Sequence, residues 1–208
     1  MNILNVGCGS MRLPPPFINL DNLRTQLHVG TPEREALDRE PNYVEHDIFT
    51  GQFPFHESSF SGIMLFHCLE HFSAQAGLKL LQDCFRVVER GGAILVSVPD
   101  ASYFRGVYPR DKNENWLELF EVSDPPNPIP TWFEAALWFE QHEAIFTEDS
   151  LWSYLTRAGF VDVKRMDAYE CCEHGDFAMD EENQVIQTMH KELNRRKFSL
   201  VMSGRKPE

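Results

Sequence analysis

The sequence predicts an α/β fold built on a doubly wound, mostly parallel sheet. Two runs, 60–66 and 93–98, are almost continuously apolar, as strands buried on both faces of a parallel sheet are. Between them, residues 74–90 carry apolar side chains at helical spacing. Right-handed crossovers in such an order place the turns that follow the parallel strands at one edge of the sheet.

The first connection of the predicted sheet is short. Residues 2–6 and 17–21 are apolar runs of strand length, and three consecutive prolines at 14–16 lie between them. Proline fixes φ and lacks a backbone donor, so this segment cannot form a full helix. We therefore expect a short or irregular connection in place of the first crossover helix.

Capping residues bound two of the predicted helices. One helix is predicted over 31–39, where Pro32 suits a first turn. Another begins after Thr147, a good N-cap residue, and ends at Gly159.

Glycines and apolar runs set the limits of the remaining predicted helices and strands. Gly91-Gly92 is predicted to end the 74–90 helix, and a further helix is predicted over 184–196. The last strand is predicted to pair antiparallel with its predecessor. The predicted strands are 2–6, 17–21, 43–47, 60–66, 93–98, 160–169 and 198–203.

Residues 101–145 interrupt this alternation. The segment is rich in aromatic residues and proline, and long loops inside compact domains are often functional. We expect a lid or substrate pocket here, with a packing insertion as the alternative. Its aromatic side chains would form either an apolar or cation-binding pocket or plain core. They are Trp116, Trp132, Phe133, Trp138 and Phe139. Residues 1–208 are otherwise predicted to form a single domain.

The composition of the chain argues against nucleic acid and membranes as binding partners. The chain has 208 residues and a formal net charge of −13, which argues against nucleic acid as a direct partner. No apolar stretch is long enough to span a bilayer, and no signal peptide is evident, so we expect a cytoplasmic protein without membrane contact. Five cysteines fit reduced thiols. Cys171, Cys172 and His174 match no common zinc spacing, and we predict no metal site.

A glycine turn and a carboxylate predict a nucleoside site. Gly7, Cys8 and Gly9 follow the first strand, and Asp21 ends the second. Glycine lets a backbone pass close to a ligand, and a carboxylate at a strand tip can accept hydrogen bonds from both ribose hydroxyls. The two features belong at one sheet edge.

An ordered series of motifs resembles the class I S-adenosylmethionine-dependent methyltransferases, in particular the small, single-domain, type 11-like members. The series runs through Asn5-Val6-Gly7-Cys8-Gly9-Ser10, Asp21, Asp47-Ile48, Leu69-Glu70-His71-Phe72, the Arg90-Gly91-Gly92 turn and residues 146–160. The resemblance covers nearly the whole chain. It implies a Rossmann-like sheet of seven strands, with the last antiparallel.

The resemblance also implies a cofactor site for S-adenosylmethionine. Gly7, Cys8 and Gly9 would pass beneath the methionine part, with Asn5 in the same predicted set, and Asp21 would take the ribose hydroxyls. Asp47 would accept from the adenine amine and Ile48 would donate its backbone N–H to the ring. His67 would border the methionine end and the acceptor. Ser10-Met11 replace a third glycine that nicotinamide enzymes more often keep, which favours the sulfonium cofactor.

Candidates for proton transfer follow the fourth predicted strand. His67 and His71 are the candidate catalytic residues, since histidine exchanges protons near neutral pH. Glu70 and His71 also fit a bracing role at the start of the next helix. Further catalytic candidates lie elsewhere in the chain: Asp100, Tyr103, Tyr108 and His142, the last of which equally fits a core position.

These features together predict a methyltransferase acting on a small-molecule or saccharide-type acceptor. Three alternatives stay open: a protein methyltransferase, an NAD-dependent enzyme on a Rossmann-like fold, and a catalytically silent cofactor-binding partner subunit. The sequence does not define the acceptor, the methylated atom or the oligomeric state.

Overall fold

The fold centres on one seven-stranded sheet in a computed structural model that describes residues 2–103, 141–166 and 199–208. The strands lie in the order β3-β2-β1-β4-β5-β7-β6. Their bounds are β1 (Ile3–Val6), β2 (Phe17–Asp21), β3 (Tyr43–Glu45), β4 (Phe60–Phe66), β5 (Val88–Pro99), β6 (Val161–Arg165) and β7 (Ser199–Arg205). All neighbours pair in parallel except β7, which is antiparallel to both β5 and β6. The predicted doubly wound sheet with its last strand antiparallel is confirmed.

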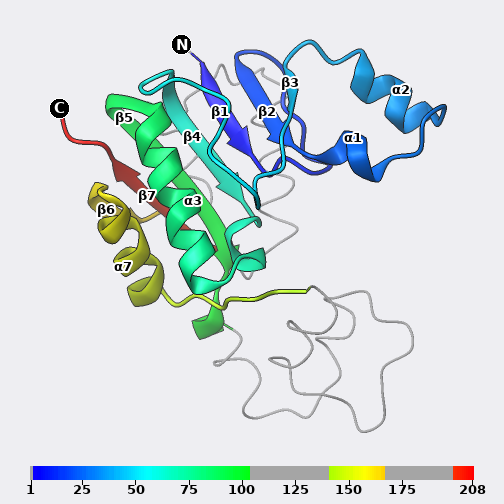
Figure 1. Ribbon diagram of the computed structural model, residues 1–208. Coiled ribbons are helices and arrows are strands. Elements are labelled where there is room, and N and C mark those ends of the chain that lie inside the picture. Colours follow the sequence, from blue (N-terminus) through cyan, green and yellow to red (C-terminus); the bar gives the residue numbers. More distant parts are fainter. Residues whose placement is uncertain (1, 104–140, 167–198) are drawn as a thin grey trace, which may run out of the picture.

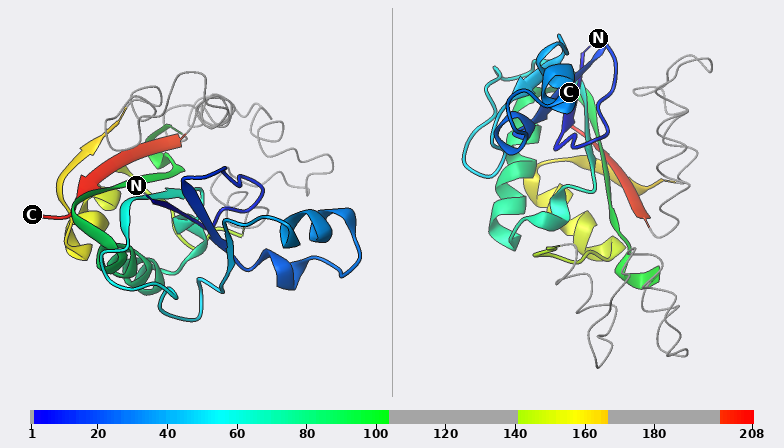
Figure 2. Two further views of the ribbon diagram at one scale, coloured as in Figure 1. Left: turned by 90° about the horizontal axis from the view of Figure 1, so that it is seen from above. Right: turned by 90° about the vertical axis from the view of Figure 1, so that its right-hand side faces the viewer.

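Helices cover one face of the sheet and one edge. Figures 1 and 2 show α3 (Ala74–Val87) and α7 (Glu148–Ala158) against the same face, and α1 (Leu23–Gln26) and α2 (Pro32–Asp38) beyond the β3 edge. A 3₁₀ turn, η1 (Leu69–His71), joins β4 to α3. No helix in the described part of the chain has both the length and the apolar character needed to cross a bilayer.

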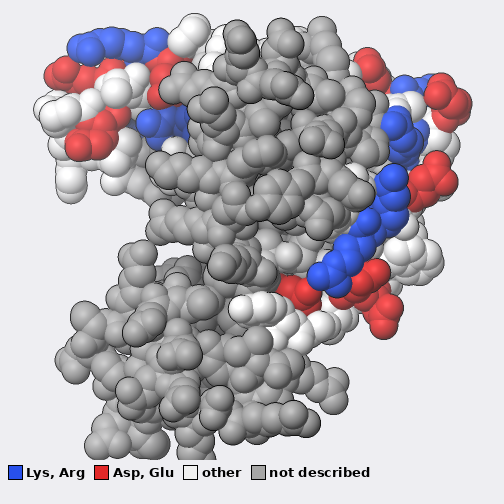
Figure 3. Space-filling view, turned by 180° about the vertical axis from the view of Figure 1, so that it is seen from behind, with Lys and Arg blue, Asp and Glu red and all other residues white. Residues whose placement is uncertain are grey.

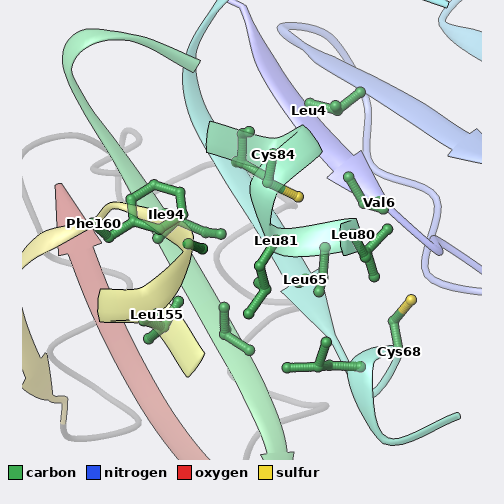
Figure 4. Packing of buried hydrophobic residues seen from close by; sticks show 14 of the residues in the cluster. Leu4, Val6, Leu65, Cys68, Leu80, Leu81, Cys84, Ile94, Leu155 and Phe160 are labelled. Atoms are coloured by element: carbon green, nitrogen blue, oxygen red, sulfur yellow. The ribbon is translucent and has the colours of Figure 1, made fainter. Parts of the chain in front are cut away.

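The main core lies between α3, α7 and this face. Leu81 and Cys84 of α3 pack over Leu65 of β4 and Ile94 of β5, as Figure 4 shows. Phe160, at the end of α7, meets Phe85 edge to face, with ring centroids 5.2 Å apart. Burying these side chains contributes about 1.5–3 kcal/mol each, which fixes α3 and the strand ends beneath it.

The predicted starts of two helices, α2 and α7, are confirmed by their N-cap residues. Thr31 caps α2 and Thr147 caps α7, each accepting a hydrogen bond from the third residue of its helix at 3.3 Å. Gly159 ends α7 in the left-handed conformation, with φ +114°. An added Cβ there would lie 2.9 Å from Phe85, so packing and backbone both require glycine.

Several predicted boundaries are wrong, among them the end of the last strand, which runs to Arg205 and not to residue 203. α3 ends at Val87, not Arg90, because Val88 is already extended and pairs with Phe60. Gly91-Gly92 therefore lies inside β5. The third strand stops at Glu45 instead of Asp47, and the sixth spans Val161–Arg165 within the predicted 160–169.

The connection after β1 contains no helix, as its prolines predict. The chain turns at Gly7–Gly9 and reaches β2 at Phe17. α1 was not predicted, since it is a single turn without a buried residue. The predicted helix at 184–196 lies outside the described residues, as does most of the 101–145 insertion.

Candidate functional site

The glycine turn and Asp21 lie together at the carboxyl ends of β1 and β2. The carboxylate of Asp21 accepts a hydrogen bond from the Gly9 N–H at 2.8 Å and another from Asn22 N–H at 2.7 Å. The side chain is 9% exposed. Asp21 is thus held in one orientation by backbone donors, and each carboxylate oxygen keeps lone-pair capacity for a ligand.

Gly7 and Gly9 have different surroundings. Both have positive φ, +63° and +48°, which glycine adopts without a Cβ penalty. A Cβ on Gly7 would collide with Cys68 and reach 3.4 Å from Ile48, so the turn packs against two other strand-end loops. A Cβ on Gly9 would meet no described residue within 4 Å. Among the described residues, the main chain at Gly9 is therefore open on the side where a side chain would project.

Asn5 and Cys8 are predicted to lie beside the cofactor, but the side chains of both point into the protein. Asn5 is buried, and its Nδ2 donates to the Met11 carbonyl at 2.8 Å and to Asn19 Oδ1 at 3.0 Å. Cys8 packs with Leu37 and Tyr43, and burial first, then Asp21, raises the pKa of its thiol. Asn5 thus holds the proline-containing connection, and only the backbone of Cys8 faces a ligand that crosses the turn.

Asp47 and Ile48 follow β3, the strand next to β2, at the same edge of the sheet as Asp21. Asp47 Oδ1 accepts from Phe49 N–H at 3.0 Å, while Ile48 is buried. Phe49 stacks on Phe72 with ring centroids 4.3 Å apart. Ile48, Phe49 and Phe72 line an open groove of about 550 Å³ against α3, so Ile48 contacts both the groove and the glycine turn.

His67 follows β4 and links three parts of the site. It has a positive φ of +47°, uncommon for a non-glycine residue. Its Nδ1 lies 3.1 Å from Glu70 Oε1, and its Nε2 lies 2.8 Å from the hydroxyl of Ser199 at the start of β7. Ser199 was missed by the sequence analysis, because 132 residues separate it from His67 and only the strand order brings them together.

Glu70 is ionised although it is almost completely buried. Burial alone would raise its pKa, but the hydrogen bond and charge of His67, together with the charge of His142, hold the pKa below its ordinary value. An ionised carboxylate only accepts hydrogen bonds, so the Nδ1–H of His67 donates to it. In this tautomer of a neutral His67, Nε2 accepts a hydrogen bond from the Ser199 hydroxyl.

His71 and His142 lie next to this chain of groups. Their ring centroids are 4.9 Å apart at an interplanar angle of 73°. Among the described residues, Glu70, His71 and His142 form a cluster in which one potential ligand atom from each lies within 4.8 Å of the others. All three are candidates from the sequence, but no spacing in the sequence predicts that they meet.

The structure gives less support for a catalytic role of the other candidates, Asp100, Tyr103 and Tyr108. The Asp100 carboxylate accepts from Ser102 N–H at 2.8 Å and pairs with Arg165 at 3.1 Å. Tyr103 is exposed and is the last residue described at the start of the 101–145 insertion, and Tyr108 lies outside the described residues. Asp100 therefore fixes the start of the insertion to β6.

A family model described as a methyltransferase domain matches residues 1–165. The chain belongs to this methyltransferase family. The match confirms the resemblance to the class I S-adenosylmethionine-dependent enzymes, since the sheet also has the seven strands and the antiparallel last strand that the resemblance implies. No curated protein matches the sequence of this methyltransferase.

Solved structures share the fold of the methyltransferase at low sequence identity. The apo form of the S-adenosylmethionine-dependent methyltransferase SibL has 20% identity and a TM-score of 0.52, over 100% of this chain and 50% of that chain. A SAM-dependent methyltransferase from Archaeoglobus fulgidus has 15% identity and a TM-score of 0.53, over 99% and 86%. Phosphoethanolamine N-methyltransferase 2 from Haemonchus contortus, in complex with S-adenosyl-L-methionine, has 13% identity and a TM-score of 0.55, over 100% and 49%. The chain thus spans about half the length of SibL and of the Haemonchus enzyme.

The residues of the site fit an adenosyl sulfonium donor. Asp21 offers an oriented acceptor at the tip of β2, and the open main chain at Gly9 leaves room for a ligand that crosses the turn. The carboxylate of Asp47 and the backbone N–H of Ile48 follow the neighbouring strand β3. A nicotinamide site would usually add a helix that begins at the glycine turn, and the described chain has none there.

Proposed function

We propose that the protein transfers a methyl group from S-adenosylmethionine to a small-molecule or saccharide-type acceptor. One observation carries the proposal: the Asp21 carboxylate is held by Gly9 N–H at 2.8 Å beside an open stretch of main chain. A ribose binds to such a carboxylate through its two hydroxyls. The family match supports methyl transfer as the reaction.

The protein's main contribution is alignment. When bound, S-adenosylmethionine supplies a methyl group on a positively charged sulfur that is already activated for in-line displacement. Asp21 would hold the ribose hydroxyls, and Asp47 with the Ile48 N–H would hold the adenine. Fixing the donor in this way turns a bimolecular encounter into an oriented one, which contributes up to about 7–11 kcal/mol in the best cases.

His67 is suited to accept a proton from an acceptor. Its Nδ1–H is held by the ionised Glu70, which leaves the Nε2 lone pair for proton uptake. Ser199 occupies that lone pair at 2.8 Å, so an acceptor hydroxyl would either displace the Ser199 hydroxyl or pass its proton through it. His71 is the second candidate, and it lies in the cluster with His142.

We propose that the 101–145 insertion, part of one methyltransferase domain over 1–208, borders the acceptor. Its two ends are held to each other and to Glu70: Ala101 N–H donates to the Phe146 carbonyl at 2.9 Å, and Glu143 N–H donates to the Glu70 carbonyl at 2.8 Å. An insertion anchored there is placed to select what approaches the methyl group.

Charge supports a small acceptor over nucleic acid. The net charge is −13, and Figure 3 shows basic side chains of the described residues lying beside acidic ones on that face. Nucleic-acid binding draws most of its affinity from clustered Lys and Arg. An acidic surface equally suits a basic protein tail, so protein methylation stays the second candidate.

Calorimetric titration tests the donor half of the proposal. We expect S-adenosylmethionine and S-adenosylhomocysteine to bind and NAD not to bind. Asp21→Ala should weaken binding of S-adenosylhomocysteine by about 1–3 kcal/mol, the cost of leaving polar partners unmatched. Asp38→Ala, at a largely exposed position of α2, is the matched control and should bind normally. Binding of NAD alone, or normal affinity in Asp21→Ala, would overturn the assignment.

Transfer of a radiolabelled methyl group tests the acceptor half. Hydroxyl-bearing small molecules and saccharides should accept the label, whereas histone-like and ribosomal proteins should not. Label on the proteins alone would favour the protein methyltransferase. Donor binding without transfer to any acceptor would favour a silent partner subunit.

A further inference from the structure

Three potential metal ligands from two separate segments meet beside the proposed methyl-transfer site. Glu70 and His71 come from η1, and His142 comes from the segment that returns from the insertion. Their ligand atoms all lie within 4.8 Å of one another. Glu70 is 1% exposed and His142 is 8% exposed, so the cluster is largely removed from solvent.

Backbone hydrogen bonds hold the two segments together. The Glu70 carbonyl accepts from the N–H groups of Glu143 and Ala144, at 2.8 and 3.0 Å. His71 N–H in turn donates to the Cys68 carbonyl at 3.2 Å, which closes η1. The three side chains are therefore brought together by main-chain contacts that do not depend on their own chemistry.

One oxygen of Glu70 lacks the partner that a buried carboxylate needs. Oε1 lies 3.1 Å from His67 Nδ1, but Oε2 is buried and has no hydrogen-bond partner among the described residues. A buried charged oxygen without a donor or a cation costs free energy. A cation among the three side chains would remove this cost.

We propose that Glu70, His71 and His142 bind a divalent transition-metal ion, with zinc as the reference case. Two imidazoles and one carboxylate suit zinc and its neighbours better than magnesium, which prefers oxygen ligands. Three protein ligands leave a fourth position for water or substrate, as in catalytic zinc sites. The His67 contact orients the carboxylate, as outer hydrogen-bond partners of metal ligands do.

The open fourth coordination position of the metal indicates which class of acceptor the protein would prefer. This inference rests on the proposed function. η1 begins just after Cys68, and its Glu70 contacts His67 at 3.1 Å, so a metal bound there would lie on the proposed acceptor side of the site. The metal would take an acceptor oxygen as its fourth ligand and lower the pKa of that hydroxyl. Acceptors with a hydroxyl that can reach the metal should therefore be preferred over amines.

Metal binding is tested on the full, untagged chain without any methyl donor. Protein treated with a chelator and desalted is equilibrated with Zn²⁺, Co²⁺, Mn²⁺ or Mg²⁺, and bound metal is measured by mass spectrometry and by competition with a chromophoric chelator. We expect one Zn²⁺ per chain, weaker Mn²⁺ binding and negligible Mg²⁺ binding. His142→Ala should weaken Zn²⁺ binding at least tenfold, and so should His71→Gln.

Two controls make the outcome decisive. His56→Ala removes an exposed histidine that does not belong to the cluster, and the variant should bind Zn²⁺ normally. A Cys171→Ser, Cys172→Ser double variant should also bind normally. No bound metal in the wild type, or loss of metal in the cysteine variant instead of His142→Ala, overturns the proposal. Circular dichroism of His71→Gln and His142→Ala checks that both variants are folded. A loss of zinc affinity can then be assigned to the missing ligand and not to unfolding.

The readout separates this proposal from the proposed function. Titration of the metal-free wild type with S-adenosylhomocysteine tests the donor site alone, and zinc titration tests the cluster alone. Donor binding without zinc binding would leave the methyltransferase proposal intact and remove the metal site.

Discussion

The Nε2 atom of His67 lies 2.8 Å from the hydroxyl oxygen of Ser199. This contact joins the carboxyl end of β4 to the first residue of the antiparallel strand β7. On its other side the ring contacts Glu70, so one imidazole connects two distant strands with the buried carboxylate. Four predictions follow from this arrangement and from the packing around it.

Ser199→Ala should release the His67 ring without emptying the donor site. The lost hydrogen bond should lower the free energy of unfolding by about 0.5–1.5 kcal/mol. Affinity for S-adenosylhomocysteine should stay unchanged, since Ser199 does not contact the glycine turn or Asp21. Urea unfolding and calorimetry measure the two quantities. Unchanged stability would mean that the contact contributes nothing in solution.

Gly7→Ala and Gly9→Ala form a matched pair. Both place a side chain at positive φ, which costs about 1–2 kcal/mol. Only Gly7→Ala also forces a Cβ into Cys68, so it should be the less stable variant in urea unfolding. Gly9→Ala should instead retain most of its stability but lose affinity for S-adenosylhomocysteine. Equal stability of the two variants would contradict the packing described at Gly7.

Glu70→Gln should lower stability in a pH-dependent way. The pKa of folded Glu70 lies below its ordinary value of 4.5, so the ionised group stabilises the fold above that pH. The contribution is lost as the pH falls below 4.5 through the lowered pKa. Unfolding of chelator-treated protein between pH 7 and about pH 3 should therefore show a gap between wild type and variant that is constant down to about pH 4.5 and narrows below it. A constant gap would exclude an ionised Glu70 as its cause.

Three cysteines should resist alkylation in the native protein. Cys8, Cys68 and Cys84 are buried free thiols, and burial raises the pKa of each. The reactive thiolate is therefore scarce at pH 8. Peptide mapping after iodoacetamide should find them unlabelled in buffer and labelled in urea. Native labelling of Cys8 would show that the glycine turn opens.

The apolar runs predicted most of the sheet because burial on both faces leaves a local signature. The 60–66 and 93–98 runs became β4 and the inner part of β5. The end of α3 was misplaced because Val88 suits a helix equally well by spacing, and its pairing with Phe60 is a tertiary effect.

The donor half of the site was more predictable than the catalytic half. Gly7, Gly9 and Asp21 follow strand ends that parallel topology places together, so their spacing carries the information. The contacts of His67 with Ser199 and of His71 with His142 join residues far apart in the chain. No periodicity links such pairs, and they emerge only when β7 and the end of the insertion return to the sheet.

The bridge between Asp100 and Phe146 has an evolutionary consequence. The chain leaves the sheet and rejoins it at neighbouring points, so the stretch between them can be exchanged, shortened or lengthened without shifting the register of any strand. Recombination at these two positions would change the insertion and leave β1, β2 and the glycine turn between them unaltered.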